Sequence, residues 1–600
     1  MNRDLGQLSE RVFDMLVIGG GIYGAYCAWD AAQRGLSVAL VEKADFGSAT
    51  SSNSFRVIHG GLRYLQHADV RRMRESIRER RTLMRIAPHL VHPLPFVIPT
   101  YHHPLRSKWA LAAAFLVNDL IGYDRNHSVD AERRLPRGRV ISRREYLTSC
   151  PGVNDAGVTG GAVWYDCQMH NSERLLLSVL RAAVAAGAVV ANYVEVTEFL
   201  RRGNRVTGIR ANDVSAESAL EIRANIVVNA TGPWVDQVLS LLDKRCFGQP
   251  QPLSKAMNLV VNRTLVQGHA VGVYGARTFH DDDAVIRRGS RLFFITPWHR
   301  RSLIGTAHLP YQGDVNAFAV TEEDVQNFLD EVNEAYPAAT IKREEVTAVH
   351  RGLLPMAGVN PATNDVKLTK HPRILDHLQK EGINGIISVT GVKYTTARRV
   401  AQRAVDLACH KLGKKTPACR TAMTPVYGGE IDRLSAFVKE ETTRHEQVCD
   451  AETMRHLIYN YGAAYPAVLR YVEEGVDFNQ PLTPESPVIK AEIIHAVREE
   501  MALRLSDVIL RRTELGIVGN PGDCCLSTCA EIMAAELGWD TQRKEKELAE
   551  TRALFSSPGS VYAQSAFPLP VARSQRAAVC STTLPSSREG AVASARPGIE

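Results

Sequence analysis

The sequence lacks the cysteine spacing of a zinc site. Its eleven cysteines are scattered along 600 residues, and the one cluster, Cys524, Cys525 and Cys529, has neither two C-x-x-C pairs nor a neighbouring pair of histidines. We therefore predict no metal site. Scattered cysteines are also typical of a chain whose thiols stay reduced, as they do in the cytoplasm.

Long apolar runs and concentrated charge are absent as well. The most apolar stretch, residues 109–117, is about nine residues long, whereas a bilayer span needs roughly 20. No charged-then-apolar leader precedes the first predicted strand, so we expect no secretion signal. The net charge of +7 is too diffuse to indicate nucleic acid, although it suits an anionic substrate or membrane surface. We expect a cytoplasmic protein, and peripheral contact with the inner face of the cytoplasmic membrane stays open.

The chain is long enough for two or more domains, and its most informative stretch comes first. Residues 14–42 predict a strand, a glycine turn, a helix and a second strand. Gly19, Gly21 and Gly24 have the G-x-G-x-x-G spacing that gives a tight turn, a close approach to a pyrophosphate and close helix packing. Glu42 ends the second strand, where a carboxylate can accept both ribose hydroxyls. A dinucleotide site is favoured over an ordinary glycine-rich turn.

Three further stretches favour a bound flavin. The loop at residues 47–54 is rich in hydroxyl groups that can bind phosphate oxygens. A buried strand at residues 222–232 runs into Ala-Thr-Gly, which is common in flavin-binding folds, and the stretch 385–397 predicts a strand, a glycine turn and a helix start. That helix N-terminus would stabilise negative charge on a reduced flavin. The candidate cofactor contacts in these stretches are Thr50, Ser51, Ser52, Thr231, Gly232 and Gly391.

The rest of the chain predicts a sheet, helices and a tail. Residues 255–310 alternate as in an antiparallel substrate-binding sheet. Residues 71–85 predict a charged surface helix, with a basic membrane-binding helix as the alternative. Apolar residues follow a 3.6-residue period over 490–515, which predicts one helix. Residues 556–600 are rich in Ser, Pro, Ala and Arg without a period and predict disorder.

Several stretches resemble the FAD-dependent, respiratory glycerol-3-phosphate dehydrogenases, over roughly residues 14–555. The most specific are IHGGLRYL at residues 58–65 and EEMALRLSDVILRRTELG at residues 499–516; DMLVIGGGIYG, ATSSNS, NATGPWV and IGTAHLPYQGD also match. The resemblance implies an α/β fold of the D-amino-acid-oxidase-like flavoprotein superfamily. It implies an FAD-binding Rossmann-like domain interleaved with an antiparallel β-sheet substrate domain, followed by a C-terminal α-helical domain. It also implies oxidation of sn-glycerol 3-phosphate to dihydroxyacetone phosphate, with electrons passed to a membrane quinone.

The domain boundaries that we expect follow from these patterns. Residues 1–13 form an N-terminal extension, and residues 14–415 hold the two interleaved domains. The substrate part of that segment is mainly 88–160 and 245–355. The helical domain is expected at 416–555 and the tail at 556–600. The sequence leaves a homo-oligomer open.

The site expected from the resemblance lies in two motifs. His59 is the best-placed base, because it follows the phosphate loop and precedes two glycines; a structural histidine that binds the loop backbone is the alternative. Arg63 and Tyr64 resemble substrate-contacting positions, and a guanidinium can hold a phosphate by two parallel bonds. Lys393 matches a family lysine that can contact the substrate or the flavin's negative charge. The candidate catalytic residues are His59, Arg63 and Lys393, and the candidate substrate contacts are Arg63, Tyr64, Thr306, Arg351 and Lys393.

Three positions depart from the family pattern. Leu354 stands where the family has an arginine that would clamp the phosphate, and Asn258 stands where it has a histidine. His308 stands where the family has the aspartate of a Gly-Thr-Thr-Asp pattern. A lost charged hydrogen bond to phosphate costs about 1.5–3 kcal/mol. Arg351, a neighbour in sequence, is the candidate substitute. A paralogue that retains FAD but oxidises another small hydroxylated or amino substrate is therefore the second reading, and a non-catalytic flavin-binding module is the third.

Overall fold

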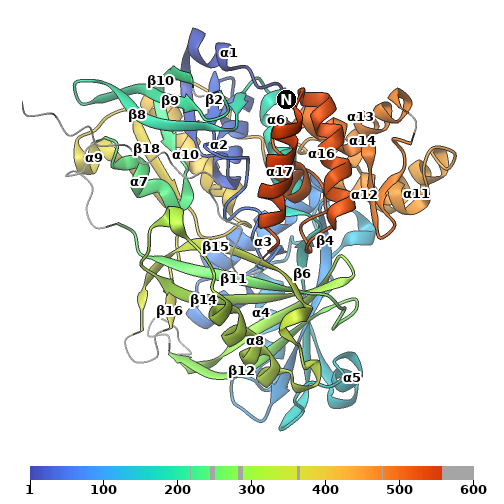
Figure 1. The fold of residues 1–600 in the computed structure, drawn as a ribbon. Coiled ribbons are helices and arrows are strands. Elements are labelled where there is room, and N and C mark those ends of the chain that lie inside the picture. The colour runs from blue at the N-terminus through green and yellow to red at the C-terminus, as the bar shows by residue number, and fades with distance from the viewer. Residues whose placement is uncertain (217, 243–249, 281–287, 361–364, 476, 557–600) are drawn as a thin grey trace, which may run out of the picture. The chain divides into compact units, whose positions relative to one another are not determined.

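The computed structural model describes residues 1–216, 218–242, 250–280, 288–360, 365–475 and 477–556. Those residues form two large sheets and a C-terminal helical region (Figure 1). The predicted α/β fold class is confirmed. The tail predicted to be disordered lies outside the described residues except for Ser556.

The first sheet is built on the dinucleotide unit. Its central strands are parallel and buried on both faces, which is why they are continuous apolar runs. Its strands, in order across the sheet, are β17 (Arg373–Asp376), β18 (Ile386–Thr390), β10 (Ser218–Asn229), β1 (Val12–Ile18), β2 (Val38–Val41) and β7 (Val189–Ala191), and the antiparallel strands β8 (Val194–Arg202) and β9 (Arg205–Asp213) extend it from β10.

Helices α2 (Ile22–Gln33), α6 (Ser172–Ala185) and α10 (Ala397–Leu412) contribute to the apolar core of the first sheet. The expected N-terminal extension is part of this unit. Helix α1 (Leu5–Glu10) contacts β10, and its Leu8 is fully buried. The predicted boundary at residue 14 falls inside β1.

The second sheet is mostly antiparallel, as the alternation over residues 255–310 predicts. Helix α8 (Glu322–Ala335) contributes five apolar side chains to the core against it. Its strands, in order, are β16 (Val366–Leu368), β15 (Val346–Val359), β11 (Leu253–Val261), β14 (Arg301–Tyr311), β13 (Arg288–Trp298), β12 (Ala270–His280), β4 (Val91–Tyr101), β6 (Val158–Met169) and β3 (Val57–Ile58), and β5 (Arg139–Ser142) pairs with β6.

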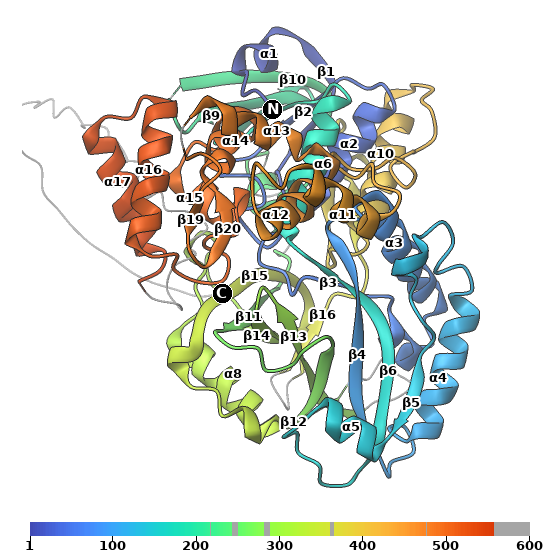
Figure 2. The same cartoon turned by 90° about the vertical axis from the view of Figure 1, so that its right-hand side faces the viewer.

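Helix α3 (Val70–Ile86) is not the surface helix that its charges predict. It lies beside β4 (Figure 2) and buries Met73, Ile77 and Leu83. Arg80 is also buried, because it forms an ion pair with Asp166. The high charge of α3 suggests a solvated face, but the charge of Arg80 belongs to an internal ion pair. The alternative that this helix binds a membrane therefore loses its support.

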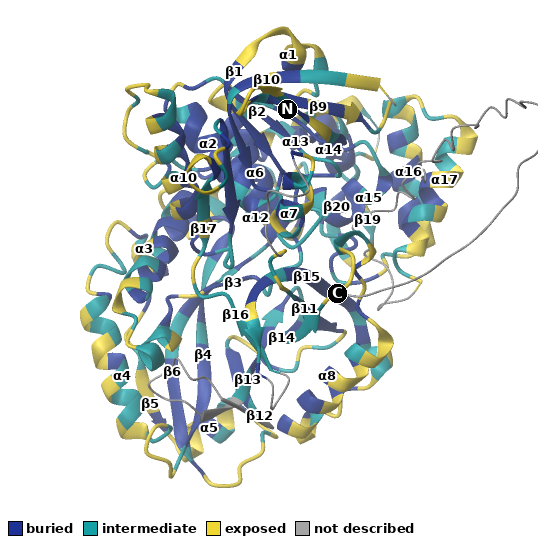
Figure 3. Ribbon diagram, turned by 90° about the vertical axis from the view of Figure 1, so that its left-hand side faces the viewer, coloured by how far each residue is buried: buried dark blue, intermediate teal, exposed yellow. Residues whose placement is uncertain are grey.

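Helix α4 (Lys108–Ile121) has the opposite character. Trp109, Leu116 and Leu120 lie on one helical face and are 75%, 64% and 68% exposed. Figure 3 shows this helix coloured mainly as exposed and intermediate. No helix among the described residues is long and apolar enough to cross a bilayer.

The C-terminal region is helical, but its most periodic segment is interrupted. The main helices are α11 (Leu434–Arg444), α12 (Ala451–Tyr461), α14 (Lys490–Glu500), α16 (Asp523–Leu537) and α17 (Thr541–Ala553), with a short hairpin of β19 (Pro481–Thr483) and β20 (Ser486–Ile489). The predicted helix over 490–515 is wrong in extent, because α14 stops at Met501, whose φ is 55°. The chain then forms α15 (Leu505–Asp507) and the π-helical turn η9 (Val508–Arg512).

An ion-pair network joins the residues after this break to the loop that follows β2. Asp45, in the loop after β2, accepts hydrogen bonds at 2.7 Å from both terminal nitrogens of Arg512. Arg511 joins the same carboxylate. Both residues of the Asp45–Arg512 pair are fully buried, so losing either partner leaves an uncompensated charge.

Candidate active site

A cavity of about 550 Å³ lies between the two sheets, within the usual range for a cofactor site. Its walls come from the β1–α2 turn, the loop that follows β2, the turn between β18 and α10, and strands β11, β14 and β15 of the second sheet. Its lining includes the predicted residues Gly19, Gly21, Glu42, Thr50, Ser51, His59, Thr231, Gly232, Thr306, Gly391 and Lys393.

One end of the cavity is formed by backbone that only glycine permits. Gly19 has a φ of +106°, and a Cβ on Gly24 would lie 1.9 Å from the Gly19 carbonyl oxygen. A Cβ on Gly391 would lie 1.7 Å from the Tyr23 ring. The Tyr23 hydroxyl donates to the Lys393 carbonyl oxygen at 2.7 Å, so the ring has no room to withdraw. Gly24 itself packs helix against strand and does not line the cavity.

Two polar side chains fix this cofactor end. Glu42 accepts hydrogen bonds from the Gly20 amide at 2.7 Å and the Ala44 amide at 2.9 Å, which leaves lone pairs for ribose hydroxyls. Burial raises the pKa of Glu42 despite these two bonds. Ser51 Oγ accepts from the Ile22 amide at the start of α2 at 3.0 Å. Its neighbour Ser52 is buried and donates to the Gly47 carbonyl oxygen, so it supports the loop rather than facing the cavity.

The other end of the cavity holds His59 in a hydrogen-bonded chain. His59 Nδ1 lies 3.3 Å from Asp166 Oδ2, and the Asp166 carboxylate also accepts from the Gly60 amide at 2.6 Å and from Arg80. Burial alone would raise the pKa of Asp166, but Arg80 and His59 hold it below its ordinary value. The ionised carboxylate keeps a proton on Nδ1 and leaves the Nε2 lone pair of His59 as an acceptor.

Lys393 is held above the Tyr64 ring. Its Nζ contacts the Tyr64 hydroxyl and lies 4.1 Å from the ring centroid. Burial, followed by the charge of Arg72, lowers the pKa of Lys393 to about 7. Arg63 is exposed and does not line the cavity, but its charge contributes to this lowering. The structure thus groups Arg63, Tyr64 and Lys393 beside the His59 end.

The departures from the family pattern all line the same end. Asn258 Oδ1 accepts from the Thr306 hydroxyl at 2.7 Å, and His308 and Leu354 complete that wall. Burial, together with Arg63 and Arg291, lowers the pKa of His308 to about 4. His308 is therefore neutral near pH 7 and offers a phosphate no positive charge.

The structure does not bring Arg351 into this group. Arg351 is 1% exposed and does not line the cavity. Side chains alternate along a strand, so Arg351 and Leu354, three residues apart on β15, point to opposite faces of the sheet. This placement gives no support to Arg351 as a substitute for the arginine expected at Leu354.

Sequence reasoning missed Asp166, Arg80 and Tyr23. Asp166 lies near the end of an apolar strand pattern, and such an isolated acid is the one signal that could have identified it. Arg80 was obscured by the other arginines of α3. Tyr23 lies inside the glycine motif, where its contact with Gly391, far away in sequence, leaves no local pattern.

The cavity fits an FAD. The glycine turn gives backbone access at the start of α2, Glu42 presents a carboxylate after β2, and the cavity continues from there to His59 and Lys393. Fold and site together define an FAD-dependent oxidoreductase. The family model described as FAD dependent oxidoreductase matches residues 14–406, and one described as C-terminal domain of alpha-glycerophosphate oxidase matches residues 419–544.

Individual relatives narrow the class. A glycerol-3-phosphate dehydrogenase of Synechocystis is 32% identical over 91% of this chain and 97% of its own length, and one of Mycobacterium leprae is 33% identical over 90% and 88%. The crystal structure of the glycerol-3-phosphate dehydrogenase from Bacillus halodurans complexed with FAD superposes with a TM-score of 0.71 at 26% identity, covering 91% of this chain and 95% of that one. The chain belongs to the family of FAD-dependent glycerol-3-phosphate dehydrogenases, and FAD is its cofactor.

Proposed function

We propose that the protein oxidises sn-glycerol 3-phosphate to dihydroxyacetone phosphate. The observation that supports this most directly is the His59–Asp166 pair, which lies at the end of a flavin cavity beside two cationic side chains, Arg63 and Lys393. A secondary alcohol needs a base at its hydroxyl and an electron acceptor at its carbon. Bound FAD supplies the acceptor.

In this proposal each residue has one role. His59 Nε2 accepts the proton of the substrate hydroxyl, and Asp166 stabilises the imidazolium that results. Arg80 keeps Asp166 ionised through the buried ion pair. Protonated Lys393 holds the phosphate, and Arg63, which lies outside the lining, adds positive charge near it; the phosphate carries the charge that distinguishes this substrate from glycerol.

The test is an anaerobic titration of the purified holoprotein with glycerol 3-phosphate, with glycerol as the control. We expect the flavin absorbance to bleach rapidly with the phosphorylated compound alone. A flavin that dithionite reduces but glycerol 3-phosphate does not would overturn the proposal.

A second candidate function is favoured by the side chains of the substrate wall. Leu354 and neutral His308 line the cavity where a phosphate clamp is expected, and Arg351 is not among the lining residues. These features suit a paralogue that oxidises another small hydroxylated or amino compound. A panel of such compounds in the same bleaching assay separates the two functions, because this paralogue would be reduced by a substrate without phosphate.

We also propose that a membrane quinone takes the electrons and that α4 provides the membrane contact. Trp109, Leu116 and Leu120 form an apolar stripe on one face of α4, and Lys108 precedes the stripe. A helix of this kind lies in the membrane interface with its apolar side chains inserted.

Vesicle binding tests the contact. The double substitution of Leu116 and Leu120 by Glu should abolish co-sedimentation with anionic vesicles at low salt and slow the reduction of a vesicle-embedded quinone. It should leave bleaching by substrate unchanged. Leu378→Glu, at an exposed leucine of α9 (His377–Glu381), is the matched control. Equal vesicle binding of wild type and double variant would refute the α4 contact.

A further inference from the structure

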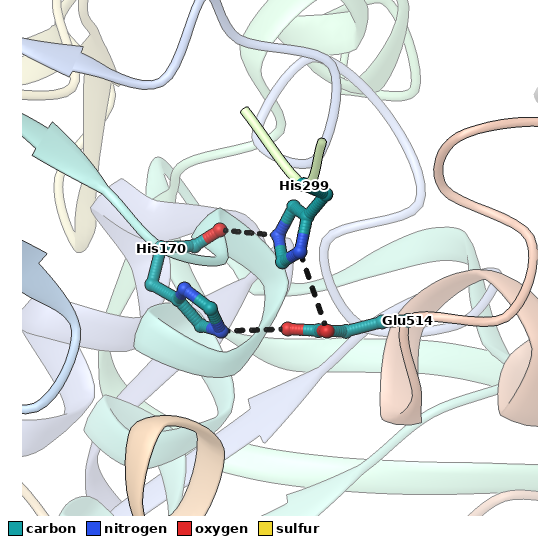
Figure 4. A group of neighbouring side chains, drawn as sticks. All are labelled: His170, His299 and Glu514. Carbon is teal, nitrogen blue, oxygen red and sulfur yellow. Dashed lines mark hydrogen bonds and ion pairs between the residues drawn. The ribbon is translucent and has the colours of Figure 1, made fainter. Parts of the chain in front are cut away.

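Two histidines and a glutamate converge outside the flavin cavity. Figure 4 shows His170, His299 and Glu514 pointing toward one another. His170 follows β6, His299 lies in the turn between β13 and β14, and Glu514 lies just after η9. Their side chains are 19%, 16% and 10% exposed, so the cluster is largely enclosed but reachable from solvent.

The donor atoms are close enough to share one ion. His170 Nε2 lies 2.8 Å from Glu514 Oε1, and His299 Nδ1 lies 3.4 Å from Glu514 Oε2. One ligand atom from each of the three residues lies within 4.8 Å of the other two. Ligand atoms on a tetrahedral zinc at about 2.0–2.1 Å are roughly 3.3 Å apart, so small side-chain rotations complete the geometry.

Both ring nitrogens of His299 face oxygen atoms. Nδ1 faces the Glu514 carboxylate, and Nε2 lies 3.1 Å from the His170 carbonyl oxygen. A neutral imidazole has one N–H, so one of these contacts brings a lone pair against an oxygen. A metal ion on Nδ1, with Nε2–H donated to the carbonyl, satisfies both contacts and is the common outer-shell arrangement of a metal-bound histidine.

Glu514 also has a partner outside the cluster. Its carboxylate is 3.4 Å from His456 Nδ1, and the other nitrogen of His456 is 3.1 Å from Glu492.

The turn that presents His299 is held in an unusual conformation. His299 and Arg300 have φ values of 47° and 59°, so both central residues of this two-residue hairpin are left-handed. Such turns favour Asn-Gly, and neither residue here is of that kind. Residues whose backbone is held in this conformation are often found at ligand-binding sites.

We propose that His170, His299 and Glu514 bind one divalent transition-metal ion of the zinc class, with water in the fourth position. Two imidazoles and a carboxylate are a donor set that zinc prefers. The ion joins the β13–β14 hairpin and the C-terminal region to the end of β6.

The experiment uses the full-length holoprotein, freed of metal with a chelator and titrated with Zn²⁺ in a calorimeter. We expect one zinc per chain with a submicromolar Kd and a higher Tm. His299→Asn removes a ligand but suits the left-handed turn, and Glu514→Gln removes the carboxylate with little change of shape. Each should weaken zinc binding by more than about 100-fold, since even outer-shell partners contribute roughly 10–100-fold.

His410→Asn, at an exposed histidine of α10, is the matched control and should bind zinc as the wild type does. The amount of FAD bound per chain shows whether each variant folds. If His299→Asn loses FAD, the zinc affinity of Glu514→Gln decides the test. The proposal would be overturned if the wild type did not bind zinc stoichiometrically, or if the variants that fold still bound zinc stoichiometrically.

Discussion

The two ends of the flavin cavity are built in different ways. The cofactor end is shaped by backbone, with glycines at positions where any Cβ would collide. The substrate end is shaped by side chains from separate elements: His59 follows β3, Thr306 and His308 lie on β14, Leu354 on β15, and Lys393 follows β18. The first construction tolerates little change. The second can change its specificity by single substitutions while the cofactor stays bound.

The largest effect is expected at the cofactor end, from Gly24→Ala. The new Cβ would lie 1.9 Å from the Gly19 carbonyl oxygen, and that oxygen belongs to the backbone, so it cannot rotate away as a side chain can. We expect FAD content below about a tenth of wild type, and a free energy of unfolding lower by about 3 kcal/mol or more. Absorbance per chain and urea unfolding measure the two quantities. Gly6→Ala in α1 is the control, because its Cβ would meet nothing nearer than an Asp4 oxygen at 3.3 Å. A yellow, stable variant would mean that the backbone end is less rigid than its contacts indicate.

At the substrate end, His59→Asn should remove catalysis and leave the cofactor in place. Loss of the base is expected to lower kcat by about 10²–10⁴-fold, while FAD content stays at the wild-type level because His59 supports no part of the glycine turn. Asp166 keeps its ion pair with Arg80. Stopped-flow bleaching gives the rate, and His371→Asn, at an exposed histidine, gives the baseline. A decrease in kcat of less than tenfold would mean that His59 has a structural role and is not the base.

The same contrast explains what the sequence can predict. The cofactor end follows from local spacing, because Gly19, Gly21 and Glu42 lie within one β-α-β unit. Asp166 and Leu354 meet His59 only through strand pairing over long separations, which no local pattern encodes. Arg351 shows the limit most clearly: it is a neighbour of Leu354 in sequence but lies on the opposite face of β15. Likewise, the helical period over 490–515 does not indicate the break at Met501, after which Arg511 and Arg512 form buried pairs with the distant Asp45.

A smaller effect is expected from the titration of Lys393. Its amine is protonated below its pKa of about 7 and neutral above it. If it holds the phosphate, kcat/KM for glycerol 3-phosphate should gain a component that falls about tenfold per pH unit above pH 7. Lys393→Arg keeps the backbone bond to Tyr23 and stays charged, so the ratio of variant to wild-type kcat/KM should rise over that range. The substrate and the other ionisable groups titrate in the same way with both proteins, so their effects cancel in this ratio. A constant ratio from pH 7 to 9 would show that the charge of Lys393 does not bind substrate.

The smallest effect is expected from Ser51→Ala, and it tests whether a side chain matters at the backbone-built end. Ser51 Oγ accepts from the Ile22 amide at the start of α2, so its loss should lower the free energy of unfolding of the FAD-free protein by about 1 kcal/mol, as the loss of a helix cap does. With FAD bound, the freed amide is available to a phosphate oxygen and offsets the missing hydroxyl. We therefore expect the Kd for FAD to change by less than about fivefold, the equivalent of roughly 1 kcal/mol. Urea unfolding of the apoprotein and a flavin-binding titration measure the two quantities, with Ser48→Ala from the same loop as the control. A loss of affinity of two decades would make the Ser51 hydroxyl a principal phosphate ligand, and the cofactor end would then depend on side chains as the substrate end does.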